Sequence, residues 1–183
     1  MIRVIIGIVF LCSEFMQAQD VHYSQFDKTT SFINPSLIAN QNEDYEIQLQ
    51  RRSQWSSVTT PFNTISVSFN VLEMYKTLSS GITILNDIAG DSYFSTNGIS
   101  FSIANSFNAK HNLFSFGVQA SLYQRSINYD ELVFLQNEQL EITNFSFFDV
   151  GIGVSNYKTL DFKSAILVGI SVFHLNKPKQ SLA

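Results

Sequence analysis

The histidine and acidic side chains are the residues that could bind a metal ion or act in acid–base catalysis. The three histidines, His22, His111 and His174, lie far apart in the sequence, whereas metal-binding histidines normally recur at short, fixed spacings. Serine, histidine and aspartate all occur, but no segment resembles the nucleophile elbow of a hydrolase. We therefore expect no enzymatic activity, with no catalytic residues, no metal site and no cofactor.

Two short motifs raise alternatives that involve a ligand. The segment NDIAGD contains Asp87 and Asp91, which could belong to a calcium loop. A tight turn, with Asn86, Asp87 and Gly90 in the turn positions, is the simpler interpretation. The segment GIGVSN, which begins at Gly151, has only two glycines of a dinucleotide-binding fingerprint and lies in a strand-like pattern. We expect these glycines to be small residues on the polar face of a strand.

The composition narrows the class of protein. The chain has 183 residues, of which 45% are hydrophobic, 14% aromatic and only 14% charged. Soluble domains typically have about 25% charged residues. The mean hydropathy of +0.07 is too low for a helical membrane protein. The net charge of −4 argues against a nucleic-acid partner, which would require a basic surface.

The N-terminus has the pattern of a secretory signal peptide over residues 1–18. Arg3 precedes an apolar run over residues 4–11, and Ala18 is a small residue suited to a cleavage site. A buried N-terminal helix is the alternative. Cys12, the only cysteine, lies inside this segment, so the mature chain is expected to fold without disulfide bonds.

The rest of the chain alternates apolar and polar residues, as in TISVSFNVL at residues 64–72. Strict alternation predicts a strand with one apolar and one polar face. Seven segments show the pattern: 45–50, 64–72, 82–84, 99–104, 114–123, 148–155 and 165–172. Between them we find no convincing helical period, so an all-β antiparallel fold is expected.

The polar face of these strands suggests a membrane barrel. It carries Ser, Thr, Gln, Asn and Gly with few charges, which suits a hydrated lumen better than a water-exposed surface. The strands are expected to be about 8–11 residues long, as a tilted membrane-crossing strand requires. Aromatic residues near the expected strand ends could form interfacial girdles: Tyr45, Trp55, Phe62, Tyr75, Phe107, Phe114, Tyr123, Phe145, Tyr157 and Phe162. A secreted carbohydrate-binding β-sandwich remains the alternative.

The register of the alternation predicts which residues face lipid. They share an apolar side chain in the alternating positions: Ile65, Val67, Phe69, Phe116, Val118, Ile152, Val168 and Ile170. Arg51 falls in the same register, so either it reaches the interface with its long side chain or the register shifts there. Arg125 follows a long strand and is expected to be a lumen or interface charge, or a contact with a partner.

The segment of residues 19–42 has no sustained period and is expected to be irregular or partly helical. Asn34-Pro35 either stops a local helix or contributes to a plug or docking motif. The physical interpretation that we prefer is the stop.

Several segments, taken together and in order, resemble the PorP/SprF family of Bacteroidetes outer-membrane proteins of the type IX secretion system. They are QDVHYSQF (19–26), FINPSLIAN (32–40), RRSQW (51–55), PFNTISVSF (61–69), GITILNDIAGD (81–91), FSFGVQASLYQRSINYDEL (114–132), DVGIGV (149–154) and GISVFHLNKPKQSL (169–182). The family-motif positions in them are Gln25, Phe26, Asn34, Pro35, Trp55, Pro61, Phe62, Asn86, Asp87, Gly90, Gln124 and Arg125.

The resemblance implies an antiparallel transmembrane β-barrel of about fourteen strands in the outer membrane. It also implies a non-enzymatic role in exporting or surface-anchoring large adhesins, with a possible link to gliding motility. Outer-membrane lipid, other type IX secretion components and a secreted adhesin are the implied partners; a general solute-transport barrel is the alternative. Family members are nearly twice as long, so we expect a half-barrel fragment over residues 43–183, after a signal peptide (1–18) and an N-terminal plug segment (19–42).

Overall fold

The computed structural model describes residues 23–25, 28–57, 61–90, 94–127, 144–161 and 163–180. Two short helical elements, α2 (Thr30–Ile33) and the 3-10 helix η3 (Pro35–Asn40), precede seven strands. The strands are β1 (Tyr45–Gln54), β2 (Phe62–Tyr75), β3 (Leu78–Ala89), β4 (Phe94–Ala109), β5 (Asn112–Ser126), β6 (Asn144–Asp161) and β7 (Ser164–Val172). The expected all-β fold class is therefore confirmed.

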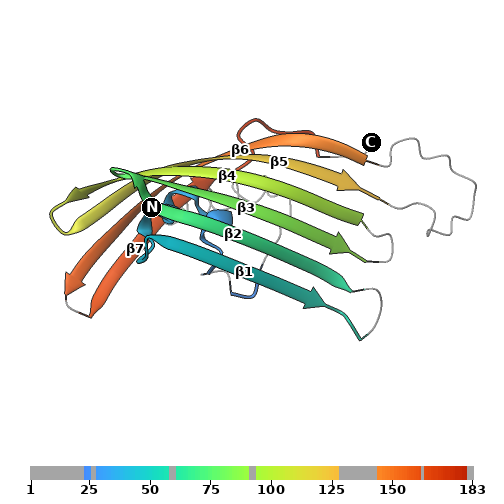
Figure 1. Ribbon diagram of the computed structural model, residues 1–183, viewed down its shortest axis with the longest axis horizontal. Coiled ribbons are helices and arrows are strands. Elements are labelled where there is room, and N and C mark those ends of the chain that lie inside the picture. The colour runs from blue at the N-terminus through green and yellow to red at the C-terminus, as the bar shows by residue number, and fades with distance from the viewer. Residues whose placement is uncertain are drawn as a thin grey trace, which may run out of the picture.

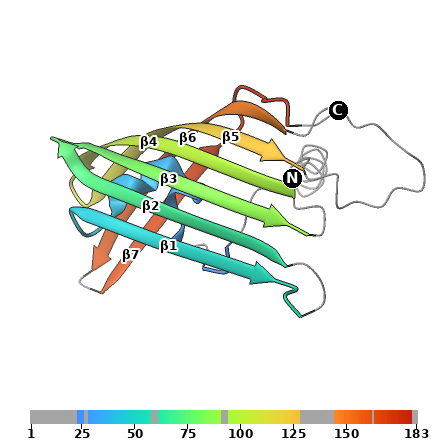
Figure 2. The same ribbon diagram turned by 45° about the vertical axis from the view of Figure 1, so that its right-hand side comes forward.

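The seven strands form one sheet in the order of the sequence, and each strand pairs antiparallel with the next. The sheet curls into a half-barrel, and α2 and η3 lie within the curl (Figures 1 and 2). The described residues contain no second sheet facing the first. The β-sandwich alternative is therefore wrong.

The strands are longer than the sequence suggested. β6 has 18 residues and β4 has 16, against an expected length of about 8–11. Polar residues beyond the alternating segments continue the ladder, and some of their side chains also pair across the strands. Asn86 Nδ2, for example, donates to Asn97 Oδ1 at 2.7 Å.

The predicted turn at NDIAGD is wrong for two of its three residues. Asn86 and Asp87 lie inside β3, opposite Asn97 and Thr96 of β4. Only Gly90 lies in a turn, with a φ of +63° that favours glycine. The proposed calcium loop would also need Asp91, which is outside the described residues.

The outer, convex face of the sheet is apolar, in the predicted register. Ile65, Val67, Phe69, Phe116, Val118, Val168 and Ile170 are exposed, and Ile152 is partly exposed. The alternation is sharp in β2, where Val67 is 41% exposed while Ser66 and Ser68 are 2% and 4% exposed. A water-soluble sheet would bury the apolar set instead.

The concave face is lined by small polar side chains that are buried. They include Ser66, Ser68, Thr83, Ser100, Ser102, Ser115, Ser121 and Ser155, none more than 5% exposed. The buried apolar cluster among the described residues contains only Ile38, Ala39 and Ala104. The molecule is thus polar inside and apolar outside, which is the arrangement of a membrane barrel rather than of a soluble domain.

The structure shows on which face of the sheet three further residues lie. Arg51 pairs with Ile65 without a register shift and is exposed on the convex face. Tyr123 and Phe145 were expected in an interfacial girdle, but both lie in the inward-facing register of β5 and β6. The alternation continues unbroken to these strand ends, and it keeps both rings on the concave side. Phe162 is outside the described residues.

Candidate functional site

The N-terminal segment of residues 28–40 is packed against the concave face. η3 contacts all strands from β2 to β6, and two of its own residues, Ser36 and Ile38, are almost completely buried against them. The expected helix stop is observed, because α2 ends at Ile33, Asn34 is extended and Pro35 begins η3. We call the part of the concave face under this segment the seat.

Asn34 joins the segment to two strands at once. Its side-chain Nδ2 donates to the carbonyl oxygen of Val154 in β6 at 3.1 Å and to that of Ile170 in β7 at 3.2 Å. Its Oδ1 accepts from the backbone N–H of Ser36 at 2.9 Å and from the Ser36 hydroxyl at 2.7 Å. All the polar capacity of a buried amide is used, which is how such a group is stabilised.

Glycines make room for this contact. Gly117 of β5 and Gly153 of β6 lie directly opposite each other, and Gly169 of β7 lies opposite the residue two positions further along β6. A Cβ atom at Gly117 would overlap the backbone at Pro35 and Ser36, and one at Gly153 would overlap the Asn34 side chain. A Cβ at Gly169 would lie 2.9 Å from Asn34 Nδ2. The seat therefore requires glycine for close backbone approach.

A chain of hydrogen bonds holds η3 on either side of the glycines. The Ser115 hydroxyl donates to Asn40 Oδ1 at 2.9 Å, and Asn40 Nδ2 donates to the Ser155 hydroxyl at 3.1 Å. The Ser36 hydroxyl lies 2.8 Å from the same Ser155 oxygen. These bonds connect η3 to β5 and β6, so the serines on the concave face are specific partners rather than passive small residues.

The preceding helix α2 is fixed in the same way. The hydroxyls of Ser31 and Thr83 in β3 lie 3.2 Å apart. The Ser171 hydroxyl of β7 donates to the carbonyl oxygen of Ile33 at 2.5 Å. The segment consequently spans the curl from β3 to β7.

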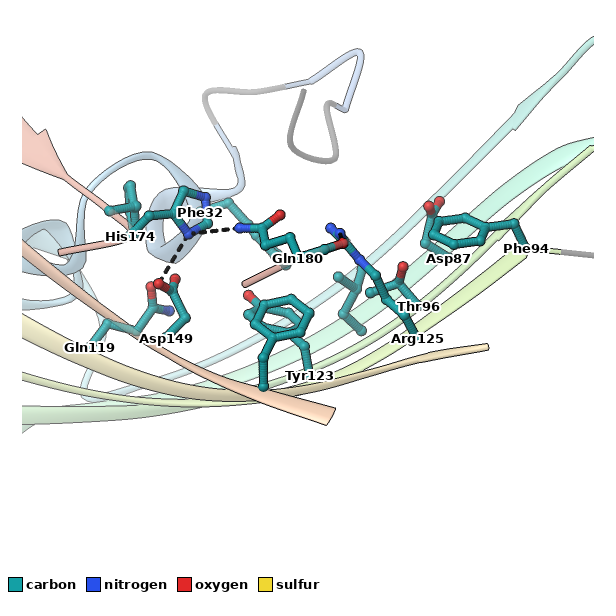
Figure 3. Close-up of a pocket in the computed structure, with 13 residues that line it drawn as sticks. Phe32, Asp87, Phe94, Thr96, Gln119, Tyr123, Arg125, Asp149, His174 and Gln180 are labelled. Carbon is teal, nitrogen blue, oxygen red and sulfur yellow. Dashed lines mark hydrogen bonds and ion pairs between the residues drawn. The ribbon is translucent and has the colours of Figure 1, made fainter. Parts of the chain in front are cut away.

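A cavity of about 150 Å³ lies beyond the seat, at the other end of the concave face (Figure 3). Its walls come from α2, β3, β4, β5, β6 and the residues after β7. The lining residues combine aromatic rings with charged and amide side chains: Phe32, Leu85, Asp87, Phe94, Thr96, Gln119, Tyr123, Arg125, Phe147, Asp149, Phe173, His174 and Gln180. We call this space the cavity.

The cationic group of the cavity is held by rings and by a backbone carbonyl. The Arg125 guanidinium lies 5.1 Å from the centre of the Phe147 ring and 6.0 Å from that of Phe94, within the range of cation–π attraction. Its Nη1 donates to the carbonyl oxygen of Gln180 at 2.9 Å. The long side chain is thereby kept in one orientation.

The acidic groups of the cavity also have partners. Asp149 is 3% exposed, and its Oδ1 lies 3.0 Å from His174 Nδ1. The Asp87 carboxylate accepts from the Thr64 hydroxyl at 2.5 Å. Each of the two carboxylates therefore lies beside a polar group of a neighbouring side chain.

Tyr23 packs against Phe32 of the cavity lining, with the ring centres 5.6 Å apart. Burial raises the pKa of the Tyr23 phenol, and the nearby Asp87 carboxylate raises it further, while Ser66 acts in the opposite direction. The phenol therefore stays neutral at physiological pH.

The residues after β7 return to the edge of β6. β7 pairs with β6 only as far as Ile152, and Asn176 occupies the next positions. Its Nδ2 donates to the carbonyl oxygen of Phe148 at 2.6 Å, and its Oδ1 accepts from the backbone N–H of Val150 at 3.2 Å. The backbone N–H of Leu175 also donates to the carbonyl oxygen of Val150 at 3.0 Å. Backbone and side-chain amide together thus hold to β6 the segment that carries His174 and Gln180.

The structure brings together only some of the family-motif positions. Asn34 and Pro35 lie in the seat, and Asp87 and Arg125 line the cavity. Trp55 packs edge-on against Phe62 at 5.3 Å, near the β1–β2 connection. The remaining described positions lie outside both regions: Gln25, Pro61, Asn86, Gly90 and Gln124. Phe26 is outside the described residues.

Sequence reasoning missed part of both regions. Gly117 and Gly169 were not singled out, although each is a glycine at a polar, inward-facing position of a strand, as Gly153 is. Asp149 and His174 were not connected, because 25 positions separate them and only the return of the chain after β7 brings them together.

The described residues contain neither a metal-binding cluster nor a membrane-spanning helix. No three histidine, cysteine, aspartate or glutamate side chains among them gather as a metal ion would require. Within the same residues, no helix has the length and apolar character needed to cross a membrane.

Comparison with known proteins gives one match. The family model described as "Type IX secretion system membrane protein PorP/SprF" matches residues 15–183. No curated protein matches the chain. No solved structure matches it either.

Proposed function

Because the chain belongs to the PorP/SprF family of type IX secretion system membrane proteins, we propose that it is a non-enzymatic component of that system in the outer membrane. The observation that carries the proposal is the inverted polarity of the sheet. Exposed apolar side chains such as Val67 and Val118 cover the convex face, while buried serines line the concave face. A convex apolar surface of this kind is suited to lipid.

In this proposal, residues 1–18 direct the chain across the inner membrane, residues 19–42 form a plug, and residues 43–183 form part of a barrel. The protein supports the export or surface anchoring of large adhesins, and through them gliding motility. Its partners are outer-membrane lipid, other type IX secretion components and the adhesin. The family match supports the secretion role, and the seated segment of residues 28–40 supports the plug.

The seated segment also argues against a general solute channel. Such a channel needs a continuous hydrated path along the concave face. Here η3 contacts the strands from β2 to β6 and buries Ser36 and Ile38 against them. A solute would have to displace the segment, together with the hydrogen bonds of Asn34, to pass over the seat.

The test is deletion of the gene in the native organism, followed by complementation. We expect the protein in the outer-membrane fraction, and we expect the deletion strain to lose its surface adhesin while still exporting an unrelated type IX cargo enzyme. Complementation should restore the adhesin. A protein found soluble in the periplasm, or a deletion strain with normal surface adhesin and normal gliding, would contradict the proposal.

A further inference from the structure

We propose that the convex surface beside the β4–β5 turn binds the phosphate of an anionic phospholipid headgroup. This surface, which we call the basic rim, consists of Lys110, His111 and Lys158. The inference rests on the outer-membrane position proposed above, because a lipid reaches the rim only where the convex face meets a bilayer. It goes further by assigning headgroup recognition to particular residues and by naming the chemistry of the headgroup.

The fold brings the three side chains of the rim together. Lys110 and His111 form the turn between β4 and β5, and the His111 carbonyl oxygen accepts from the backbone N–H of Thr159 at 3.1 Å. Lys158, the residue before Thr159, lies opposite Asn112 and continues the convex register of β6. All three rim side chains are exposed, and none forms an ion pair within the described residues. A phosphate can therefore approach both ammonium groups directly.

The excess of positive charge at this end of the sheet is confined to the rim. The start of β1 and the end of β2 carry three carboxylates around Lys76: Glu43, Asp44 and Glu73. At the β6–β7 turn, the charge of Asp161 offsets that of Lys163, and the Asp161 carboxylate also accepts from the Lys163 backbone N–H at 2.8 Å. An anion is therefore attracted to the rim more than to its surroundings.

The other end of the same three strands carries no such charge. There the convex positions of β4, β5 and β6 are Asn97, Gln124 and Ser146, which lie opposite one another in the ladder. Carboxamide and hydroxyl groups are neutral. The lysines of these strands thus mark only one boundary of the apolar face, which indicates an anionic partner at that boundary.

An aromatic pair places the rim at the depth of lipid headgroups. Phe107 and Phe114 lie opposite each other beside the turn, with ring centres 5.3 Å apart, and are 57% and 37% exposed. Aromatic rings are enriched where the hydrocarbon of a membrane meets its headgroups. A lysine just beyond such rings can extend its ammonium group into the headgroup layer, where the lipid phosphates lie.

The lengths of the connections decide between two sources of phosphate. Phospholipids and lipopolysaccharide both carry phosphate groups, but they occupy opposite leaflets of an outer membrane. The turns at the rim end are short, at residues 76–77, 110–111 and 162–163, whereas the long connection of residues 127–143 starts at the other end (Figure 1). Short turns of outer-membrane barrels face the periplasm. The rim therefore belongs to the inner leaflet, which consists of phospholipid.

The experiment measures how strongly single lipids are held by the full chain without its expected signal peptide. Native mass spectrometry of the protein in lauryldimethylamine oxide micelles gives an apparent dissociation constant for the first bound phosphatidylglycerol and for the first bound phosphatidylcholine. We expect phosphatidylglycerol to bind at least about fivefold more tightly. Added salt should reduce this preference.

A double variant tests the location, and a matched double variant serves as its control. Lys110→Gln combined with Lys158→Gln should abolish the preference for phosphatidylglycerol, and each single change should reduce it in part. Lys177→Gln combined with Lys179→Gln removes the same charge from exposed positions after β7 and should leave the preference unchanged. Circular dichroism verifies that each variant is folded.

Cysteine labelling in cells tests which leaflet the rim meets. Lys76→Cys, in the turn between β2 and β3, should react with a membrane-impermeant maleimide only after the outer membrane is permeabilised. Ser56→Cys, in the connection at the other end of the sheet, should react in intact cells. Reaction of Lys76→Cys in intact cells would overturn the proposal.

The binding data could also overturn it. Equal binding of the two phospholipids, an equal loss of preference in the rim and control variants, or a rim-dependent preference for lipopolysaccharide over phosphatidylglycerol would each do so. The cell fractionation described above tests the outer-membrane position separately. A protein that resides in the outer membrane but shows no preference for phosphatidylglycerol would therefore contradict the rim alone.

Discussion

The seat and the cavity lie on the same concave face but differ in the residues that line them. In the seat, Gly117, Gly153 and Gly169 let the backbone and side chains of residues 34–36 reach the sheet. In the cavity, rings and charged groups hold the neighbouring segment away, and a space of about 150 Å³ remains. One region is filled by the chain itself, whereas the other retains a cavity.

The difference follows the inward-facing positions of single strands. Along β5 they are Gly117, Gln119, Ser121, Tyr123 and Arg125, so the large side chains lie at the cavity end. β6 shows the same gradient in reverse, from Gly153 through Asp149 to Phe147. One sheet thus forms both the packed seat and the cavity through a change of side-chain size at alternate positions.

The largest expected effect comes from adding a side chain in the seat, where there is no room for one, in comparison with a substitution in the cavity. Gly153→Val should lower the free energy of unfolding by about 3 kcal/mol, because its Cβ would overlap the Asn34 side chain. In the cavity, Thr96→Val should cost about 1 kcal/mol, since it introduces no overlap and removes only one hydroxyl group. Urea unfolding in detergent micelles measures both. Equal costs would mean that the seat is not packed as described.

A smaller effect is expected from the hydrogen bonds of the seat. Asn34→Ala should cost about 2 kcal/mol, because it removes donors to the carbonyl oxygens of Val154 and Ile170. The matched change in the cavity, Gln180→Ala, should cost about 0.5 kcal/mol or less, because Arg125 bonds to its backbone carbonyl, which remains. The same unfolding assay applies. An unchanged free energy of unfolding in Asn34→Ala would show that the Asn34 hydrogen bonds do not stabilise the seat.

The arrangement of the strands could be predicted from the sequence, because alternation reports which face of a strand is apolar. That is why the outward positions from Ile65 to Ile170 were placed correctly. The strand ends could not be predicted, since polar pairs such as Asn86 and Asn97 resemble loop residues in a single sequence. The place of Tyr123 in an interfacial girdle was wrong, because its nearness to a strand end was the basis of that expectation and the inward register of β5 decides its direction.

The two regions could be predicted only in part. Asn34 and Pro35 were recognised from the resemblance and from the helix stop. The seat beneath them depends on register between strands, which brings Gly117 opposite Gly153. The cavity depends on the chain returning after β7, and no local pattern indicates that Asn176 would bond to the edge of β6.

The smallest expected effect is a coupling within the seat. Ser36→Ala and Ser155→Ala should each cost about 1 kcal/mol, and the double variant should cost about 0.5 kcal/mol less than their sum, because the two hydroxyls lie 2.8 Å apart. Pairing Ser36→Ala with Thr96→Val, on the lining of the cavity, should give additive costs. A double-mutant cycle measures both, and strict additivity for Ser36 with Ser155 would show that the bond contributes nothing.

The proposed position in the membrane requires that the convex face meets lipid and that the concave face does not. Spin labels on single cysteines in β1 test it most directly, after removal of the expected signal peptide with Cys12. Ile47 and Leu49 are 74% and 70% exposed on the convex face, and Gln48 and Gln50 between them are half-buried on the concave face. In bilayers, spin labels at Ile47 and Leu49 should be accessible to molecular oxygen, which enters lipid. Labels at Gln48 and Gln50 should be accessible to a water-soluble nickel complex. Nickel access that is equal at all four positions would contradict it.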